Sequence, residues 1–191
     1  MKNLIIEGLS GAGKSIIIKL LEKKLQEKNI DYILYDENET FGDLTEEIKD
    51  INNSDIDKCF RLYNILKKLN INSELKILER FHLSYYALIQ DWNLYKEIDE
   101  ELFKDNFLIV FLDYADNLIF DRAINHADLK HDGLALAIDF FGSKEKAFEA
   151  YLNSKNNRKK ALNLTKLKFI EIDTSEMLWE KYTSEILTKL L

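Results

Sequence analysis

A glycine-rich stretch between a hydrophobic run and an apolar-periodic segment carries the clearest chemistry in this chain. Residues 8–15 read Gly-Leu-Ser-Gly-Ala-Gly-Lys-Ser, the pattern of a phosphate-binding P-loop in its strand-loop-helix setting. Glycines let the backbone wrap closely around a polyphosphate, so that successive N–H groups and the N-terminus of the next helix point at the anion. We therefore predict a nucleotide-phosphate site that is formed by Gly8, Ser10, Gly11, Ala12, Gly13, Lys14, Ser15 and Ile16.

Two polar side chains at the end of this loop are expected to act on the phosphates. The Lys14 ammonium would reach the β- and γ-phosphates, and the Ser15 hydroxyl would hold Mg²⁺. A plain glycine-rich turn is the alternative, but the motif fixes several positions at once and lies where a strand ends and a helix begins.

The rest of the chain alternates short apolar runs with helical patterns, which predicts an α/β fold with a parallel sheet covered on both faces. Strands are expected over residues 3–7, 31–35, 75–79, 107–112 and 167–172. Helices are expected over residues 15–28, 40–52, 55–69, 83–90, 94–104, 116–125, 134–152 and 176–190. Ligands of such sheets bind outside the carboxyl ends of the strands, so the residues that follow each strand are the candidates for a site.

Composition restricts the class of protein. The 191 residues are 46% hydrophobic and contain no proline- or glycine-rich linker, so we expect one domain over residues 1–191. A net charge of −7 argues against a nucleic-acid partner, and the basic run 155–160 is interpreted as a solvated helical face or loop. The sequence shows no membrane-spanning run and no leader-like segment, and its single cysteine is Cys59. These features predict a cytoplasmic protein with no membrane partner.

Several motifs resemble those of thymidylate kinases. The run from Leu4 into the P-loop is similar to the opening of that family, and Glu79-Arg80 with the following Ser84 and Ala87 resembles its Asp-Arg motif. Further similarities at 107–113, 138–152 and 170–174 extend the resemblance at intervals across nearly the whole chain.

This resemblance implies the three-layer P-loop fold of nucleoside and nucleotide monophosphate kinases, with five parallel strands in the order 2-3-1-4-5. It also implies ATP and Mg²⁺ as cofactors, a small-molecule nucleoside or nucleotide as acceptor, and Asp173 in the loop that flanks the adenine. Related kinases often pair through helices beside the acceptor pocket, which leaves a homodimer open.

The segment after the second expected strand departs from the thymidylate kinase pattern. That family carries an arginine there to grip the acceptor's phosphate, whereas this chain has Asp36, Glu37 and Glu39. Carboxylates would repel a phosphate but could take a proton from an acceptor hydroxyl. Deoxynucleoside kinases, which share the fold, place a catalytic glutamate here, and Glu37 is similar to it. A base at Asp36 or Glu39 and a solvated acidic turn are the alternatives.

The segment after the third expected strand supplies two more candidates for catalysis. Glu79 is expected to order Mg²⁺, through water or directly, or the acceptor, and Arg80 to neutralise charge on the migrating phosphoryl group. A structural salt bridge is the alternative for Arg80. In deoxynucleoside kinases a serine follows this pair, where the present chain has Phe81. The predicted acceptor contacts are Phe41, Arg61, Arg80, Ser84 and Tyr85. A place in the hydrophobic core is the alternative for the aromatic residues Phe41 and Tyr85.

Residues 122–133 take the place of the family's LID, the segment that closes over the phosphates. Arg122 is the only arginine there, so we expect it, with Lys130, to supply the positive charge; capping or pairing within its own helix is the alternative for Arg122.

The sequence thus predicts a kinase that transfers the γ-phosphoryl group of ATP to a nucleoside or a nucleoside monophosphate. Phosphorylation of another hydroxyl-bearing small molecule and a nucleotide-binding ATPase or switch are the alternatives. The Asn-Lys-x-Asp motif with which GTPases read guanine does not occur in the chain.

Overall fold

The computed structural model describes residues 2–40, 55–69, 74–125 and 138–191, and of residues 55–61 it describes the backbone alone. Five parallel strands form one sheet in the order β2-β3-β1-β4-β5, which confirms the predicted order. The strands are β1 (Asn3–Gly8), β2 (Tyr32–Tyr35), β3 (Leu75–Glu79), β4 (Phe107–Asp113) and β5 (Lys168–Asp173). Each one starts and ends within one residue of the range expected from the sequence.

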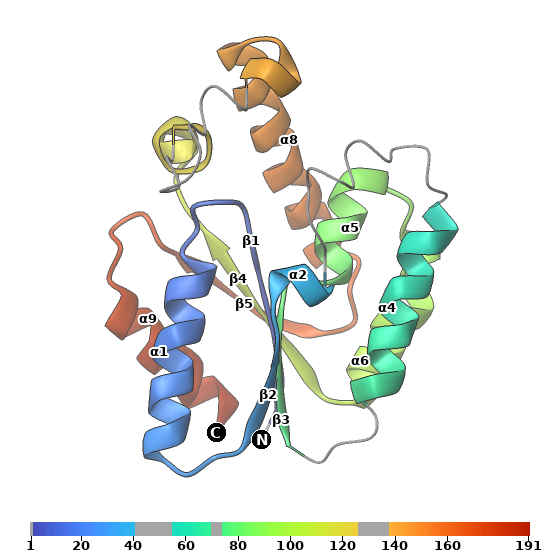
Figure 1. Cartoon of the computed structure of the whole chain (residues 1–191), viewed down its shortest axis with the longest axis vertical. Coiled ribbons are helices and arrows are strands. Elements are labelled where there is room, and N and C mark those ends of the chain that lie inside the picture. Colours follow the sequence, from blue (N-terminus) through green and yellow to red (C-terminus); the bar gives the residue numbers. More distant parts are fainter. Residues whose placement is uncertain (1, 41–54, 70–73, 126–137) are drawn as a thin grey trace.

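Helices cover both faces of the sheet (Figure 1). On one face α1 (Lys14–Glu27) packs beside α9 (Trp179–Leu190). The opposite face carries α4 (Asp55–Leu69), α5 (His82–Ile89), α6 (Lys96–Lys104) and α8 (Lys144–Leu162). Short elements complete the order, namely α2 (Glu37–Thr40), η1 (Trp92–Leu94), η2 (Asp116–Leu118) and the π-helical turn η3 (Phe120–Ile124).

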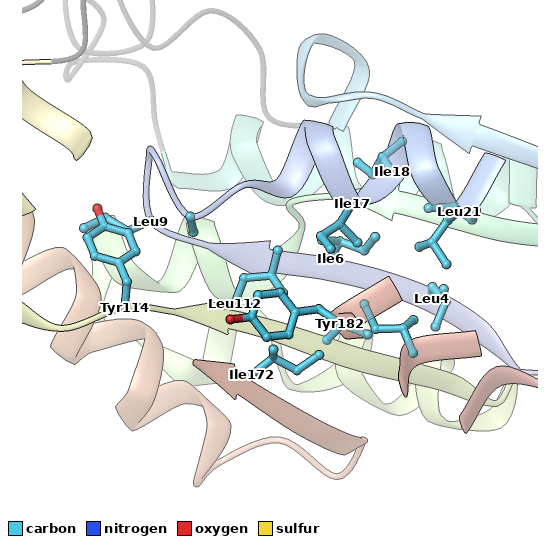
Figure 2. Packing of buried hydrophobic residues seen from close by; sticks show 14 of the residues in the cluster. Leu4, Ile6, Leu9, Ile17, Ile18, Leu21, Leu112, Tyr114, Ile172 and Tyr182 are labelled. Carbon is cyan, nitrogen blue, oxygen red and sulfur yellow. The ribbon is translucent and has the colours of Figure 1, made fainter. Parts of the chain in front are cut away.

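The alternation of side chains along β1 builds two cores. Leu4 and Ile6 pack with α1 and α9 in one hydrophobic cluster, which Figure 2 shows from close by. Ile5 belongs to a second cluster, with side chains of α4, α5 and α6. Because successive residues of a strand point to opposite faces, Glu7 lies on the same face as Ile5, toward α5. A carboxylate is thereby held in the second core, directly before the P-loop.

Two predicted helices differ from the structure. Residues 116–125 form a 3₁₀ turn and a π-helical turn in place of one α-helix. The predicted helix 134–152 is interrupted at residues 142 and 143: residues 138–141 are helical, and α8 begins at Lys144 and continues to Leu162. Ser143 sets this start, because its Oγ accepts a hydrogen bond from the Lys146 N–H at 3.2 Å, and Gly142 before it has a φ of 85°. Of the predicted helix 40–52, residues 41–52 lie outside the described ranges.

The interpretation of residues 155–160 as a solvated face is wrong for half of them. Lys155, Asn157 and Arg158 are buried, with 5%, 8% and 3% of their surfaces exposed. Carboxylates of distant segments explain this burial, since Lys155 pairs with Asp113 at 2.9 Å. Among the described residues, no helix has both the length and the apolar character that a bilayer crossing requires.

Candidate active site

The P-loop joins β1 to α1, and its three glycines are required by shape as well as by conformation. Gly8, Gly11 and Gly13 have φ angles of 148°, 74° and 88°, which other residues rarely adopt. A methyl group on Gly11 would lie 2.2 Å from the carbonyl oxygen of Arg122, and one on Gly13 would lie 2.4 Å from the Trp179 ring. Neighbouring segments thus leave room only for glycine at these points of the loop.

Lys14 begins α1 and is buried at the end of the loop. Its Nζ lies 3.4 Å from the carbonyl oxygen of Leu9. Burial, and then the positive charge of Arg80, lower the pKa of Lys14 to about 7, although Glu37 and Glu79 act in the opposite direction. A phosphate anion beside this group would favour its charged form.

Ser15 and Glu79 bring two side-chain oxygens close together. The Ser15 hydroxyl donates to Glu79 Oε1 at 3.2 Å, across from α1 to the end of β3. Burial and the nearby Glu37 raise the pKa of Glu79, while Lys14 and the Ser15 hydrogen bond oppose this rise. Mg²⁺ in phosphotransfer sites is held by one or two such oxygens together with substrate phosphates, so this pair fits the ion.

Arg80 follows β3 in a left-handed conformation, with a φ of 57°. Its backbone N–H donates to the carbonyl oxygen of Ile6 at 2.9 Å, which fixes the turn to β1. The guanidinium is 4% exposed, and its Nε lies 2.7 Å from Glu37 Oε1. A buried cation thus lies between the strand-three turn and α2.

Glu37 is the first residue of α2 and is about one-third exposed. Burial alone would raise its pKa, but the charges of Arg80 and Lys14 and the hydrogen bond from Arg80 hold the pKa below its usual value. The carboxylate is therefore ionised at neutral pH and able to accept a proton.

Thr40, at the end of α2, is fully buried and ties this helix to its surroundings. Its hydroxyl contacts the carbonyl oxygen of Glu79, and its own carbonyl oxygen accepts a hydrogen bond from the Tyr85 hydroxyl at 3.1 Å. These contacts join α2 to β3 and α5, so Glu37 is held against Arg80 by more than their ion pair.

Ser84 and Tyr85 were predicted to contact the acceptor, and the structure places both inside the protein. The Ser84 hydroxyl donates to Glu7 Oε2 at 2.6 Å, and both residues are 0% exposed. The Ser84 hydroxyl thus acts at the N-terminus of α5, whereas the Tyr85 hydroxyl binds the carbonyl oxygen of Thr40 in α2. Phe41 lies outside the described residues, as does the side chain of Arg61, so the prediction of an acceptor contact at these two positions is left as it stands.

Arg122 lies on the other side of the P-loop, in η3. Its guanidinium donates to the carbonyl oxygens of Thr174 at 3.1 Å and Ser175 at 2.9 Å, and it lies 5.2 Å from the centroid of the Tyr114 ring. This side chain joins the P-loop flank to the β5–α9 loop, the segment expected beside the adenine. The action of Arg122 on the phosphates stays a prediction.

Asp173 ends β5 and shapes that same loop. Its Oδ1 accepts hydrogen bonds from the Ser175 N–H at 2.9 Å and the Ser175 hydroxyl at 2.5 Å. A cavity of about 540 Å³ adjoins it, lined by Asp113, Tyr114, Ala115, Asp116, Lys155, Glu171 and Asp173. The lining is mostly charged and suits a polar group.

Sequence reasoning missed three residues that hold these parts in place. Tyr114 donates its hydroxyl to the carbonyl oxygen of Ser10 in the P-loop at 2.7 Å. Glu7 and Arg158 are both buried, and the Ser84 hydroxyl donates to Glu7 and accepts a hydrogen bond from Arg158. A charged residue inside the otherwise apolar run of β1 was a signal for Glu7; none marked Tyr114.

The structure therefore brings Lys14, Ser15, Glu37, Glu79 and Arg80 together at the carboxyl ends of β1 and β3. Arg122 and Asp173 meet at the β5–α9 loop, on the far side of the P-loop.

No protein-family model matches the sequence, and no curated protein sequence matches it. Solved structures do resemble it. Deoxyadenosine kinase from M. mycoides with bound dATP has a TM-score of 0.64 and 19% identity, over 100% of this chain and 99% of that one. The YorR protein of Bacillus subtilis in complex with phosphorylated GDP has a TM-score of 0.61 and 17% identity, over 99% of this chain and 95% of that one. The chain therefore has a P-loop kinase α/β fold, shared with these two structures along nearly its full length.

Proposed function

We propose that this protein transfers the γ-phosphoryl group of ATP to a hydroxyl group of a nucleoside. The ion pair of Glu37 and Arg80 carries the proposal, because it places an ionised carboxylate beside the P-loop residues Lys14 and Ser15. A phosphate-binding loop alone is compatible with many activities. Transfer to a hydroxyl also needs a carboxylate that takes the hydroxyl proton and a guanidinium that neutralises charge on the phosphoryl group.

In this reaction the P-loop N–H groups and Lys14 bind the phosphates of the donor. Mg²⁺, when bound by Ser15 and Glu79 together with those phosphates, would neutralise charge that develops on the β- and γ-phosphate oxygens. Arg80 is close enough to the same region to bind the oxygens of the transferred group. Together these groups orient the donor in line with the acceptor.

Glu37 acts as the base. The acceptor oxygen bonds to the γ-phosphorus, the bond from that phosphorus to the β–γ bridging oxygen breaks, and the hydroxyl proton passes to Glu37. Arg80 depresses the pKa of Glu37 in the free protein. When the guanidinium turns toward the phosphoryl oxygens it withdraws part of this effect, so the carboxylate becomes a stronger base as the reaction begins.

A nucleoside is favoured over its monophosphate because Asp36, Glu37 and Glu39 are all acidic. Each like charge at 4 Å would repel a phosphate by about 1 kcal/mol in water, and by more in a partly dry cleft. The similar M. mycoides protein is a deoxyadenosine kinase, which supports a nucleoside acceptor. A monophosphate is the second candidate, since the Arg80 guanidinium offsets the charge of Glu37.

ADP release in the presence of ATP and Mg²⁺ tests the proposal against a panel of ribo- and deoxynucleosides, their monophosphates and a no-acceptor control. Lys14→Ala supplies the background rate. Turnover with a nucleoside, lost in Glu37→Gln and kept in Asp36→Asn, is the expected result. Turnover with monophosphates alone would move the assignment to the second candidate. ADP release that ignores every acceptor would refute both and favour an ATPase or switch.

A further inference from the structure

A buried guanidinium on α8 lies beside Glu7 and Ser84. Arg158 is 3% exposed, and α8 runs alongside α5 (Figure 1). One terminal nitrogen of Arg158 donates to the Ser154 carbonyl oxygen at 3.2 Å and the other to the Ser84 hydroxyl at 3.4 Å; its Nε lies 4.0 Å from Glu7 Oε2. The side chain thus connects α8 to β1 and α5 at once.

Glu7 is the group that this guanidinium compensates. The carboxylate is 0% exposed and accepts three hydrogen bonds, from the Phe81 N–H at 2.8 Å, the Ser84 N–H at 3.2 Å and the Ser84 hydroxyl at 2.6 Å. These bonds cap the first turn of α5. A buried carboxylate is costly without a cation nearby, and Arg158 supplies that charge from the opposite helix.

Two hydrogen bonds, one of them to Glu7, fix the backbone on both sides of Arg80. The Arg80 N–H is held by Ile6 and the next peptide N–H, that of Phe81, is held by Glu7. A left-handed conformation is unfavourable for a residue with a side chain, so the two anchored peptides help to hold Arg80 in it. Loss of the charge that balances Glu7 would loosen one of these two anchors.

Arg158 also acts by its charge on Glu37 in the candidate active site. Burial and the nearby Arg80 lower its own pKa to about 10, so it remains a cation at neutral pH. Its charge is one of those that lower the pKa of Glu37, after Arg80 and Lys14. The expected LID offers a single arginine, which in this structure binds the β5–α9 loop.

We propose that Arg158 is a positioning residue for phosphoryl transfer, which sets the orientation of Arg80 through Glu7 and the first turn of α5. The proposal rests on the proposed kinase function for its kinetic effect, whereas its effect on Arg80 is independent of any activity.

Kinetics of Arg158→Met and Arg158→Lys, with Lys159→Met as the matched control, test the proposal. Lys159 is the next residue of α8, and its ammonium pairs with Asp113 and Glu171 away from Arg80. In Arg158→Met we expect kcat to fall about 10- to 100-fold, because a displaced catalytic group costs that much. The KM for ATP should stay within about twofold, since the P-loop is not altered. Arg158→Lys should recover part of kcat, and Lys159→Met should equal the wild type.

The pH profile separates positioning from plain destabilisation. Without the cation at 158 the pKa of Glu37 rises, so the acidic limb of kcat moves to higher pH in Arg158→Met and returns in Arg158→Lys. Arg80 and Lys14 still face Glu37 and limit the size of this shift. Equal kcat in Arg158→Met and wild type, or a fall in kcat matched by Lys159→Met, would overturn the proposal. Should Arg158→Met not fold, Arg158→Gln removes the same charge with a polar side chain, and a kcat in Arg158→Gln equal to wild type would overturn the proposal as well.

The NMR signal of the Arg80 Nε–H distinguishes failure of this proposal from failure of the proposed function. In the wild type the Arg80 Nε is buried and ion-paired with Glu37, so this proton should exchange slowly with solvent. It should shift and exchange faster in Arg158→Met but not in Lys159→Met, whether or not any acceptor is phosphorylated. An unchanged signal in Arg158→Met would overturn the positioning role even in an active kinase.

Discussion

The Arg80 Nε lies 2.7 Å from Glu37 Oε1, so the cation proposed to act on the phosphoryl group also binds the carboxylate proposed as base. The two residues come from segments that follow different strands, β3 and β2. Arg80 therefore lowers the pKa of Glu37, and each residue restricts the position of the other before any substrate binds.

Arg80→Met is expected to slow the single-turnover rate by about 10³-fold, the effect typical of an arginine that stabilises phosphoryl transfer. It should also raise the pKa of Glu37, because burial then prevails over the remaining cations. In the wild type the acidic limb from Glu37 should lie below about pH 4.5, its ordinary value, and the limb from Glu79 above it. Both limbs should move to higher pH in the variant, because Arg80 lowers both pKa values. Rates measured from pH 4 to 8 give both quantities, with Arg80→Lys as the charge-preserving control. An acidic limb at the same pH in Arg80→Met and wild type would contradict the electrostatic role.

Tyr114→Phe removes the hydroxyl that binds the Ser10 carbonyl oxygen of the P-loop. Loss of one such hydrogen bond of about 1 kcal/mol predicts roughly fivefold weaker ATP binding. Trp179, which contacts Gly13, provides a fluorescence signal for the titration in a Trp92→Phe background. Tyr32→Phe is the matched control, since that hydroxyl binds Glu22 on α1. Equal affinities for the two variants would show that Tyr114 does not hold the loop.

Gly11→Ala and Gly142→Ala separate backbone strain from close approach. Both glycines have positive φ angles, 74° and 85°, but a methyl group on Gly142 meets nothing within 4 Å. We expect Gly142→Ala to lower the free energy of unfolding by about 1–2 kcal/mol and to leave ATP binding intact. Gly11→Ala should abolish ATP binding, because the methyl group forces the loop away from Arg122. Thermal unfolding and the fluorescence titration measure the two effects, and normal ATP affinity in Gly11→Ala would contradict this account.

Asp99→Asn should destabilise the protein in a pH-dependent way. Burial would raise the pKa of Asp99, but hydrogen bonds from His82, the Lys166 N–H and the Thr165 hydroxyl lower it below 3.8. A depressed pKa contributes stability that is complete above the unfolded value and is lost as the pH falls through the folded one. The variant should therefore lose about 3 kcal/mol at pH 7 and progressively less below pH 3.8.

Urea unfolding at pH 7, 5 and 3 measures the effect of Asp99→Asn. The exposed neighbour Glu100, which pairs with Lys166, is the control, and Glu100→Gln should not change the midpoint measurably. A loss for Asp99→Asn that stays constant down to pH 3 would show that it does not arise from the ionised carboxylate.

The sheet could be predicted from sequence because apolar runs of the right length mark its strands. The P-loop also identifies residues 3–7 as the strand that leads into α1. Helix ends were harder to predict. The pattern over 134–152 gave no weight to Ser143 as a cap, although that residue sets where α8 begins. The π-helical turn over 120–124 has no signature that separates it from an α-helix.

Site residues that belong to a short continuous motif or follow a strand could be predicted from the sequence. Residues whose role depends on packing between distant segments were missed. Lys14 and Ser15 follow from the motif, and Glu37 from its place after a strand. Arg158 could not be found, because its partners on β1 and α5 are far away in the sequence and nothing in the basic run shows which side chains turn inward. Composition alone made that run look like a solvated surface.

Two buried cations one helical turn apart join α8 to opposite halves of the molecule. Lys155 pairs with Asp113 at the end of β4, and Arg158 reaches Ser84 on α5. Rotation of this helix about its axis would break at least one of these attachments, so α8 holds the end of β4 and the first turn of α5 at a constant spacing. Residues 155 and 158 should therefore tolerate less variation than their exposed neighbour Lys160.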